Sequence, residues 1–499
     1  MNVPVANWRP VLALETEAGE PLYLQLARAI TGDIERGRLR PGMRLPGTRS
    51  LAQALGVHRN TAVSAYAELA AEGWLDTFAA SGTFVSRDLP VRPRSKRRAA
   101  AARIPERPSF GLPAPPAADA QRDVEVLTNL SSGACDLRLL PLAEIARAYR
   151  RALKRHGSAL LGYGPAEGYE PLRHALAAML RAERGINVEA ENVLVCQGAQ
   201  MGLELVGRTL LRPGDRVAVE ALGYPPAWAA FRRAGARLLP VAMDGGGLDL
   251  DALERLARRT RLRAIYLTPH HQYPPTAVLP AGRRIRLLEL AARHGIALIE
   301  DDYDHEFHYD GRPVLPLASM DRAGSVVYVG TLAKVLAPGL RIGFVAAPRD
   351  AIARLTHERR LLDRQGDHAI EAAVADLIDS GQLARHVRRA RRVNQARRDH
   401  FCGELERLFG ARLRFEKPIG GIAIWARAAN GIDVEGWAAA AARHGVHLRT
   451  ARSFAVDGKA RPFVRFGFAA LDPREASGAL ERLENAWPHG RPAPSRPRR

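Results

Sequence analysis

The run Tyr328-Val-Gly-Thr-Leu-Ala-Lys334 joins an apolar, β-rich segment to a single lysine, and Arg341 follows that lysine closely. Other short apolar runs occur along the chain at Arg216–Glu220, Arg263–Thr268, Ala297–Glu300 and Arg341–Val345. Longer amphipathic helical patterns separate these runs. Near-continuous apolar strands alternating with helices are typical of a sheet that is covered on both faces. The sequence therefore predicts an α/β domain from about residue 124 to residue 487.

The ends of two of these runs carry chemistry that suits an aldehyde cofactor. Lys334 comes just after a β-run, where a rigid strand end can hold an amine that forms a Schiff base. Asp301 follows the apolar run that begins at Ala297, and an acid there can keep a pyridine nitrogen protonated, as an electron sink requires. Tyr303 lies on the same side of an extended chain and can donate to a phenolic oxygen. The set predicts a pyridoxal 5'-phosphate (PLP) site.

A phosphate group needs hydrogen-bond donors, and candidates lie at two places in the sequence. Thr331 and Arg341 flank the lysine. The backbone N–H groups of Gly198, Ala199 and Gln200 open a predicted helix, whose positive end favours anions. We therefore expect these residues to bind the phosphate of PLP.

Tyr224, in the run Leu222-Gly-Tyr-Pro225, is the candidate aromatic to cover the cofactor ring. Each of these features is weak alone. An acidic loop is more often solvated, and a glycine before a helix can be no more than a helix start. The prediction depends on finding all the pieces in one chain, in one order of strands and loops.

Residues 1–86 follow a different pattern, with three short helices and a hairpin. Leucine and isoleucine at helical spacing mark a first helix, which ends at Gly37. A second helix, Arg49–Leu55, is expected to be capped by Thr48 and to end at the turn residue Gly56. A third runs from about His58 to Glu72, and its expected inward-facing residues are Ala62, Val63, Tyr66 and Leu69. Together with a glycine-bearing hairpin, these helices predict a winged helix-turn-helix.

The start of the third helix is the candidate DNA-reading surface. His58, Arg59, Asn60 and Thr61 can all donate hydrogen bonds into a major groove. The simpler interpretation is an ordinary polar first turn. The pattern by itself does not separate these two interpretations.

Several motifs of this unit resemble the GntR-type winged helix over its whole length. They are Leu45-Pro-Gly-Thr-Arg-Ser-Leu-Ala52, Leu55-Gly-Val-His-Arg-Asn-Thr-Ala-Val63, Glu72-Gly-Trp-Leu75 and Gly82-Thr-Phe-Val85. The resemblance implies that Arg49 and the segment His58–Thr61 touch double-stranded DNA. It also implies that Gly82, in the wing, enters the minor groove.

The rest of the chain, from about Asn129 to Trp487, resembles fold-type I, class I aminotransferases. The order of winged helix, linker and aminotransferase-like domain is similar to that of the MocR subfamily of GntR regulators. The motifs that carry this resemblance are Tyr163–Arg173, Thr268–Pro274, Glu300–Gly311 and Gly330–Arg341. In that family the residue matching Lys334 carries the aldimine, those matching Asp301 and Tyr303 contact the ring, and that matching Arg341 binds the phosphate.

Two further roles follow from the same resemblance. Tyr163 would reach the phosphate, typically that of the neighbouring subunit, which implies a homodimer. Arg465 matches an arginine that holds an amino-acid carboxylate, a task suited to a bidentate guanidinium. Members that respond to γ-aminobutyrate carry a second arginine where this chain has Pro226. We therefore do not expect that compound as the effector.

Length, charge and cysteine content limit the alternatives. A chain of 499 residues holds two or three domains, and a net charge of +21 favours a polyanionic partner or reflects an arginine-rich surface. Residues 87–123 are rich in proline, arginine and alanine and are predicted to be a linker, and residues 488–499 a disordered basic tail. Three cysteines without metal-ligand spacing, no signal peptide and no membrane span indicate a cytoplasmic protein.

Two functions fit these features. The favoured hypothesis is a PLP-dependent transcriptional regulator that senses PLP, or an amino compound, through Lys334, without being an enzyme. The alternative is a working aminotransferase that retains a DNA-binding appendage, because the groups needed for a half-reaction are all represented.

Overall fold

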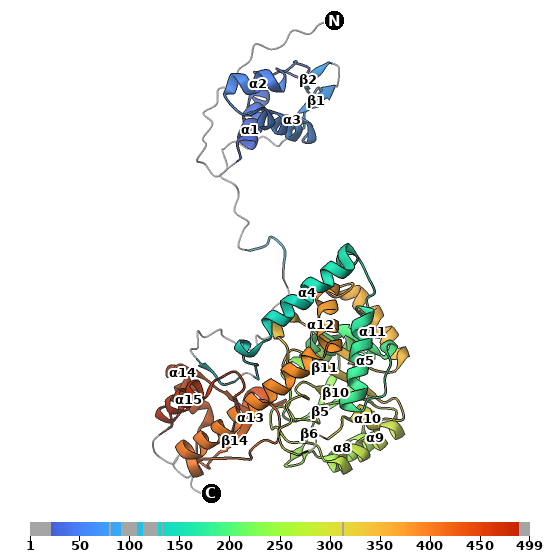
Figure 1. Cartoon of the computed structure of the whole chain (residues 1–499), viewed down its shortest axis with the longest axis vertical. Coiled ribbons are helices and arrows are strands. Elements are labelled where there is room, and N and C mark those ends of the chain that lie inside the picture. Colours follow the sequence, from blue (N-terminus) through green and yellow to red (C-terminus); the bar gives the residue numbers. More distant parts are fainter. Residues whose placement is uncertain are drawn as a thin grey trace. The chain divides into compact units, whose positions relative to one another are not determined.

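The structure, a computed structural model, describes residues 21–78, 81–90, 107–112, 128–131, 133–311 and 314–488. The chain forms two compact units, Met1–Ala118 and Asp119–Arg499 (Figure 1). Most of the predicted linker and all but the first residue of the predicted tail lie outside the described residues.

The first unit is a winged helix built on three helices and one hairpin. Its elements are α1 (Leu22–Glu35), α2 (Thr48–Leu55), α3 (Arg59–Ala71), β1 (Leu75–Phe78) and β2 (Gly82–Val85). Both α1 and α2 pack on α3, and β1 pairs with β2 in antiparallel register. Leu26, Ile30, Leu69 and Trp74 belong to a core of its own. The predicted winged helix-turn-helix is confirmed.

Two details of the predicted helices are wrong. Thr48 is the first residue of α2 and caps nothing, because Gly47 is the N-cap and no side chain bonds there. Val63 is 43% exposed, whereas Ala65 is buried. The inward face of α3 follows the spacing 62, 65, 66 and 69, and this helical period turns position 63 toward solvent.

The second unit contains a seven-stranded sheet in which most neighbours are parallel. In sheet order the strands are β4 (Val193–Cys196), β12 (Gly343–Ala346), β11 (Val326–Thr331), β10 (Ala297–Asp302), β9 (Ala264–Leu267), β5 (Arg216–Glu220) and β6 (Arg237–Val241). Only β12 runs antiparallel to both of its neighbours.

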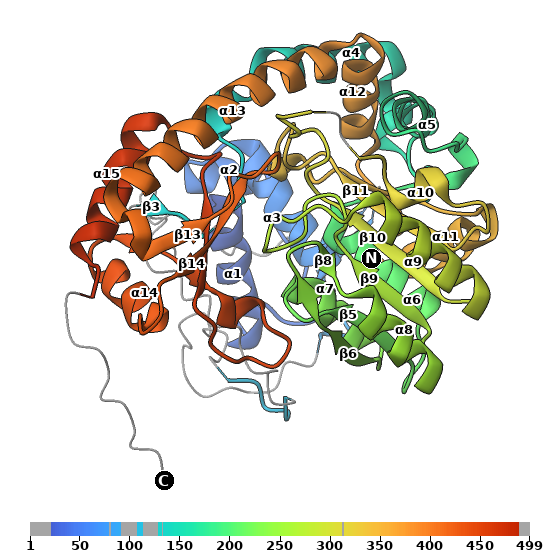
Figure 2. The same cartoon turned by 90° about the horizontal axis from the view of Figure 1, so that it is seen from below.

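Helices cover both faces of this sheet (Figure 2). One face packs on α6 (Ala199–Leu210), α7 (Pro225–Arg233) and α11 (Arg349–Leu362). The other face packs on α5 (Glu170–Arg184), α8 (Leu250–Arg259), α9 (Ala281–His294) and α12 (His368–Asp379). Neighbouring strand residues alternate between the two cores, as Leu298 and Ile299 do in β10. This arrangement confirms the predicted α/β fold.

A second, smaller sheet completes the unit. Its order is β13 (Leu413–Phe415), β14 (Ala423–Ala428), β17 (Phe463–Gly467) and β16 (Arg449–Thr450), and each neighbouring pair is antiparallel. Figure 1 shows the long helix α13 (Gln382–Phe409) running from α12 toward this sheet and toward α15 (Pro473–Asn485). The remaining α-helices are α4 (Leu142–His156), α10 (Leu317–Met320) and α14 (Val434–Arg443). Two short strand pairs complete the strands: β3 (Thr128–Asn129) with β15 (Val446–His447), and β7 (Met243–Asp244) with β8 (Gly247–Leu248).

Cys135, Cys196 and Cys402 are all free thiols. Within the described parts of the chain, none of the helices combines the length and the apolar character that crossing a bilayer requires.

Candidate cofactor and DNA-binding sites

The sheet brings Lys334 and Asp301 to one edge. Asp301 lies in β10 opposite Val329 of the parallel strand β11, and Lys334 follows β11 three residues after its end. Since parallel strands end on the same side of a sheet, both side chains reach the same region. Burial lowers the pKa of Lys334, and the positive charge of Arg465 lowers it further. The lowered pKa increases the fraction of uncharged, nucleophilic amine.

The Asp301 carboxylate has one free oxygen. The hydroxyl of Tyr266 donates to Oδ2 at 2.8 Å, whereas Oδ1 is buried and has no hydrogen-bond partner. Burial raises the pKa of Asp301 to about 7. A cationic ring N–H opposite Oδ1 would satisfy this oxygen and favour the ionised carboxylate. The residue therefore fits the pyridine nitrogen of PLP.

The raised pKa of Asp301 predicts a pH-dependent effect of PLP. Between the ordinary aspartate pKa of about 4 and a pKa of about 7, the cofactor-free folded protein holds a proton that the unfolded chain has lost. Stability without PLP should thus fall as pH rises through this range, whereas bound PLP keeps Asp301 ionised. The increase in melting temperature on adding PLP should grow with pH up to about 7 and level off above it.

Melting curves with and without PLP across this pH range check the prediction. In Asp301→Asn, which cannot ionise, the growth with pH should disappear. If the PLP-induced increase in melting temperature grew with pH equally in the variant and the parent, the titrating group would be one other than Asp301.

Tyr303 and Tyr224 both lie beside this region. The Tyr303 hydroxyl donates to the backbone carbonyl of His271 at 3.0 Å, so its one hydrogen already has an acceptor. Tyr224 packs edge-on against Tyr273, with ring centroids 5.4 Å apart. Burial, followed by the charge of Asp301, raises the pKa of Tyr224 to about 12. Burial also raises the pKa of Tyr303, so both phenols stay neutral. Tyr303 has no second hydrogen to donate, whereas Tyr224 can donate a hydrogen bond or present its ring face.

The predicted phosphate donors gather at the start of α6. Gly198 precedes this helix with φ +80°, and a Cβ there would lie 2.9 Å from the Arg341 guanidinium. Arg341 donates to the Gln197 carbonyl at 2.9 Å. The backbone N–H groups of Ala199 and Gln200 begin α6 beside it. A helix N-terminus next to a guanidinium suits a phosphate.

Thr331 and Gln200 have other side-chain partners as well. The Thr331 hydroxyl donates to the Ile342 carbonyl at 3.3 Å and accepts from the Ala333 N–H at 3.1 Å. The Gln200 amide donates to the Pro226 carbonyl at 3.0 Å. The Thr331 hydroxyl has no hydrogen left for an anion, whereas Gln200 keeps its backbone N–H and the second hydrogen of its side-chain amide.

Arg465 reaches the same region from the smaller sheet. It lies in β17 and is almost completely buried, yet its Nε and one terminal nitrogen have no hydrogen-bond partner. Its guanidinium lies over the Tyr273 ring, 4.7 Å from the centroid. A buried guanidinium with unused donors is suited to a carboxylate.

The first turn of α3 presents the predicted DNA-reading residues. Arg59 and Asn60 are exposed and Thr61 is half-buried. His58 is the N-cap, because its Nδ1 accepts from the Asn60 N–H at 3.2 Å. One ring nitrogen of His58 is therefore used locally. The other, Nε2, is left for a groove.

Arg49 and Gly82 complete the predicted DNA-binding set. Arg49 is exposed near the start of α2. Gly82 opens β2 with φ +103°, a left-handed conformation that favours glycine, and the Arg44 guanidinium lies close to it.

Comparison with known proteins accounts for both units. Residues 22–85 match the family of bacterial regulatory proteins called gntR, and residues 125–483 match aminotransferase class I and II. A probable rhizopine catabolism regulatory protein, MocR, from Rhizobium meliloti is 31% identical, covering 96% of each chain. This chain belongs to the MocR subfamily of GntR-type regulators. The predicted family is thus confirmed.

Other relatives of this MocR-type chain include regulators and enzymes. The pyridoxine biosynthesis regulator PdxR of Corynebacterium glutamicum is 34% identical over 82% of this chain and 84% of its own. The α-aminoadipate aminotransferase LysN of Thermus thermophilus, solved with N-(5'-phosphopyridoxyl)-L-leucine, superposes with a TM-score of 0.68. It is 32% identical and covers 72% of this chain and 92% of its own. The aminotransferase fold and these neighbours support the predicted cofactor, PLP.

Tyr163 lies apart from the other predicted residues of this MocR-type chain. Its side chain is 81% exposed, and the Arg364 guanidinium lies 4.1 Å from its ring centroid. A tyrosine so exposed is available to a second subunit.

The sequence did not point to several other residues of the site. Tyr266 is the partner of Asp301, and Tyr273 joins Tyr224 to Arg465. Glu220 accepts from Thr268 and Gln272, and burial raises its pKa to about 7. The one available signal was the motif Thr268–Pro274, which directly follows strand β9 and contains Thr268, Gln272 and Tyr273.

Proposed function

We propose that this chain is a PLP-dependent transcriptional regulator. The first unit would bind double-stranded operator DNA, and the second would sense PLP, or an amino compound on it, through Lys334. The observation that carries this proposal is the buried Oδ1 of Asp301, which lies near Lys334 and has no hydrogen-bond partner. The same chain also exposes the first turn of α3, the candidate DNA-reading surface. When bound, PLP supplies an aldehyde for the amine and an electron sink.

Charge and exposure support the DNA-binding half of the proposal. The net charge of +21 favours a polyanion, and the exposed side chains of Arg49, Arg59 and Asn60 are donors suited to phosphates and base edges. We assign base contacts to the first turn of α3 and a minor-groove contact to the wing at Gly82.

Arg465 supports a carboxylate-bearing amine as an effector. Its unused donors face a region that also contains Lys334, whose pKa its charge lowers. An α-amino acid would place its amine toward Lys334 and its carboxylate on Arg465. Pro226 offers no second cation, so γ-aminobutyrate does not fit this assignment.

The exposure of Tyr163 supports a homodimer. In this proposal the tyrosine of each subunit reaches the phosphate of the partner's cofactor, which explains why it contacts none of the chain's own phosphate donors in the described hydrogen bonds. Two DNA-binding units would then meet two half-sites on the operator. We place this assembly in the cytoplasm, with its three thiols reduced.

Fluorescence anisotropy on the DNA upstream of its own gene tests the proposal. The protein is stripped of PLP, titrated onto labelled DNA, and then titrated again with PLP and with a set of α-amino acids. A change in affinity with PLP, or with an amino acid added to the PLP-loaded protein, is expected for a sensor, because the two states then bind DNA differently. Specific binding that ignores every one of these additions would contradict the sensing role.

The variant Arg465→Gln separates the response of DNA affinity to PLP from its response to amino acids. It removes the carboxylate partner and leaves Lys334 and Asp301 in place, so the response to PLP should remain and the response to amino acids should be lost. An unchanged response to amino acids would remove Arg465 from the effector site.

A second candidate function is transamination. Its support is the buried, pKa-lowered Lys334 together with solved neighbours that are aminotransferases. An assay with an amino donor and a keto acid decides between the two functions. Multiple turnovers at ordinary enzyme rates of about 1–1000 per second would favour the enzyme, and a single half-reaction would agree with the regulator.

A further inference from the structure

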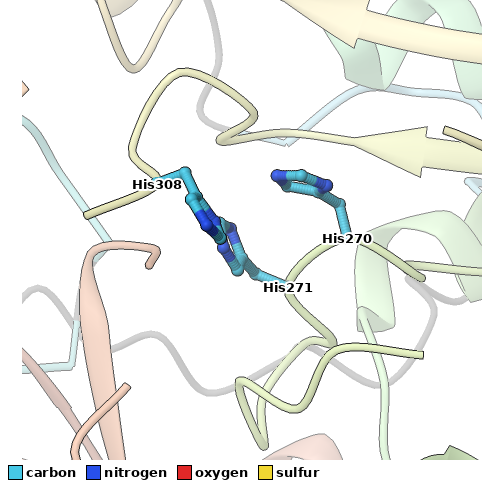
Figure 3. Close-up of side chains that lie close together, drawn as sticks. All are labelled: His270, His271 and His308. Carbon is cyan, nitrogen blue, oxygen red and sulfur yellow. The ribbon is translucent and has the colours of Figure 1, made fainter. Parts of the chain in front are cut away.

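Three histidines gather in the second unit, next to the proposed cofactor site. His270 and His271 follow strand β9, and His308 lies in the segment after β10. Their side chains are almost completely buried, with residue exposures of 2%, 1% and 8%. Figure 3 shows the rings of His271 and His308 side by side, with the His270 ring pointing toward them.

Most ring nitrogens of this cluster have no protein partner. Only Nδ1 of His271 is paired, at 2.9 Å from Oδ1 of Asp304. Both nitrogens of His270 and Nε2 of His271 are buried without a hydrogen bond, and neither nitrogen of His308 makes one of good geometry, although the backbone of Asp310 lies close to it. A buried polar atom left unpaired costs about 1–3 kcal/mol. So many unpaired atoms in one place require a partner other than this chain.

The geometry is suited to a single ion. One nitrogen from each of the three histidines lies within 4.8 Å of the other two. Zn–N bonds of about 2.0–2.1 Å in a tetrahedral site place the nitrogens about 3.4 Å apart. Small rotations of the histidine side chains would bring the nitrogens from within 4.8 Å to this shorter separation. A side chain at Gly420 would collide with the His271 ring, so glycine keeps space open there.

The surrounding acids supply the negative charge and the orientation that a cation needs. Asp304 holds His271 by Nδ1 and leaves Nε2 for a ligand bond, an arrangement found in carboxylate–histidine–zinc sites. The His305 ring stacks on the His270 ring with centroids 4.5 Å apart. Nδ1 of His305 lies 3.0 Å from Oδ2 of Asp302.

We propose that His270, His271 and His308 bind a divalent transition-metal ion, with zinc as the first choice and a water molecule as the fourth ligand. Imidazole nitrogens suit zinc, and the three-histidine set matches tetrahedral coordination with one open position. The proposal is independent of PLP and of DNA binding.

The ion would also fix the loop beside the cofactor region. The backbone carbonyl of His271 accepts from Tyr303 at 3.0 Å, so a metal bond to His271 would hold the residue that orients this tyrosine. The metal thus has a structural role next to the proposed ring contacts, with no part in any covalent step.

Cobalt titration of the metal-free full-length protein tests the site. Co²⁺ substitutes for zinc and gives visible d–d absorption in tetrahedral coordination. We expect this absorption to saturate at one ion per chain and to be displaced by Zn²⁺. No saturable absorption, with no zinc retained on analysis of the protein as purified, would overturn the proposal and leave water as the occupant.

Matched variants assign the signal to this cluster. His308→Ala removes one ligand and should weaken binding by more than the about 10–100-fold that changes in the outer shell cost. His174→Ala is the control, since His174 is exposed on α5 and far from the cluster in sequence. Circular dichroism checks that each variant folds, and His308→Asn replaces the alanine variant if that one does not. Equal cobalt binding by the His308 variants and the parent would overturn the assignment.

Discussion

Replacing Lys334 by alanine is expected to abolish the absorbance of the lysine-bound cofactor completely. Among the lysines that the structure describes, Lys334 is the one that the sheet places beside Asp301, and its pKa is lowered by burial. The sequence has five lysines in all, so few other amines compete for the aldehyde. PLP would then bind only through its phosphate and ring contacts and would wash out on dialysis.

Absorbance spectroscopy after dialysis measures this loss. Lys154→Ala is the matched control, because Lys154 is exposed near the end of α4 and should leave the spectrum unchanged. In anisotropy, the Lys334 variant should still bind the operator and should no longer change its affinity with micromolar PLP. A variant that keeps the bound absorbance would show that another lysine carries the cofactor.

Replacing Arg59 by alanine is expected to give the largest loss of DNA affinity. Arg59 is exposed in the first turn of α3, where a guanidinium can make two hydrogen bonds to a guanine edge. Losing such a contact costs about 1–3 kcal/mol, or about 5- to 150-fold in affinity, and relaxes the sequence preference. The fold should be unaffected, since the side chain belongs to no core.

Anisotropy with specific and scrambled DNA measures both effects. Arg293→Ala removes the same charge from an exposed position of α9 in the second unit and serves as the control. Specific affinity should fall steeply with salt in every variant, as counterion release requires. Undiminished specific binding by the Arg59 variant would mean that another surface reads the DNA.

The parts of the fold that follow from short-range patterns could be predicted from the sequence. The apolar runs around Tyr328 and Ile299 are buried strands, and the winged helix follows from its helical spacing and turn glycines. The errors are local. Thr48 fails as a cap and Val63 faces solvent, because a cap and a helix face are each decided by a shift of one residue.

The candidate site was predictable only in part, for a physical reason. Lys334 follows the end of β11 and Asp301 lies near the end of β10, so short apolar runs of the sequence mark both positions. Tyr266 meets Asp301, and His308 meets His271, through contacts between distant segments. No local pattern encodes which strand lies next to which. The free nitrogens of Arg465 likewise become visible only when its neighbours are known.

The groups of the site stand on two separate sheets. Asp301 lies in the seven-stranded sheet and Lys334 just after one of its strands, whereas Arg465 belongs to the four-stranded sheet. A ligand bound to the groups of one sheet alone does not constrain the position of the other sheet. A ligand with its amine at Lys334 and its carboxylate on Arg465 would connect the two sheets, and its length would set the distance between them. Ligand length would then be a variable that this protein measures.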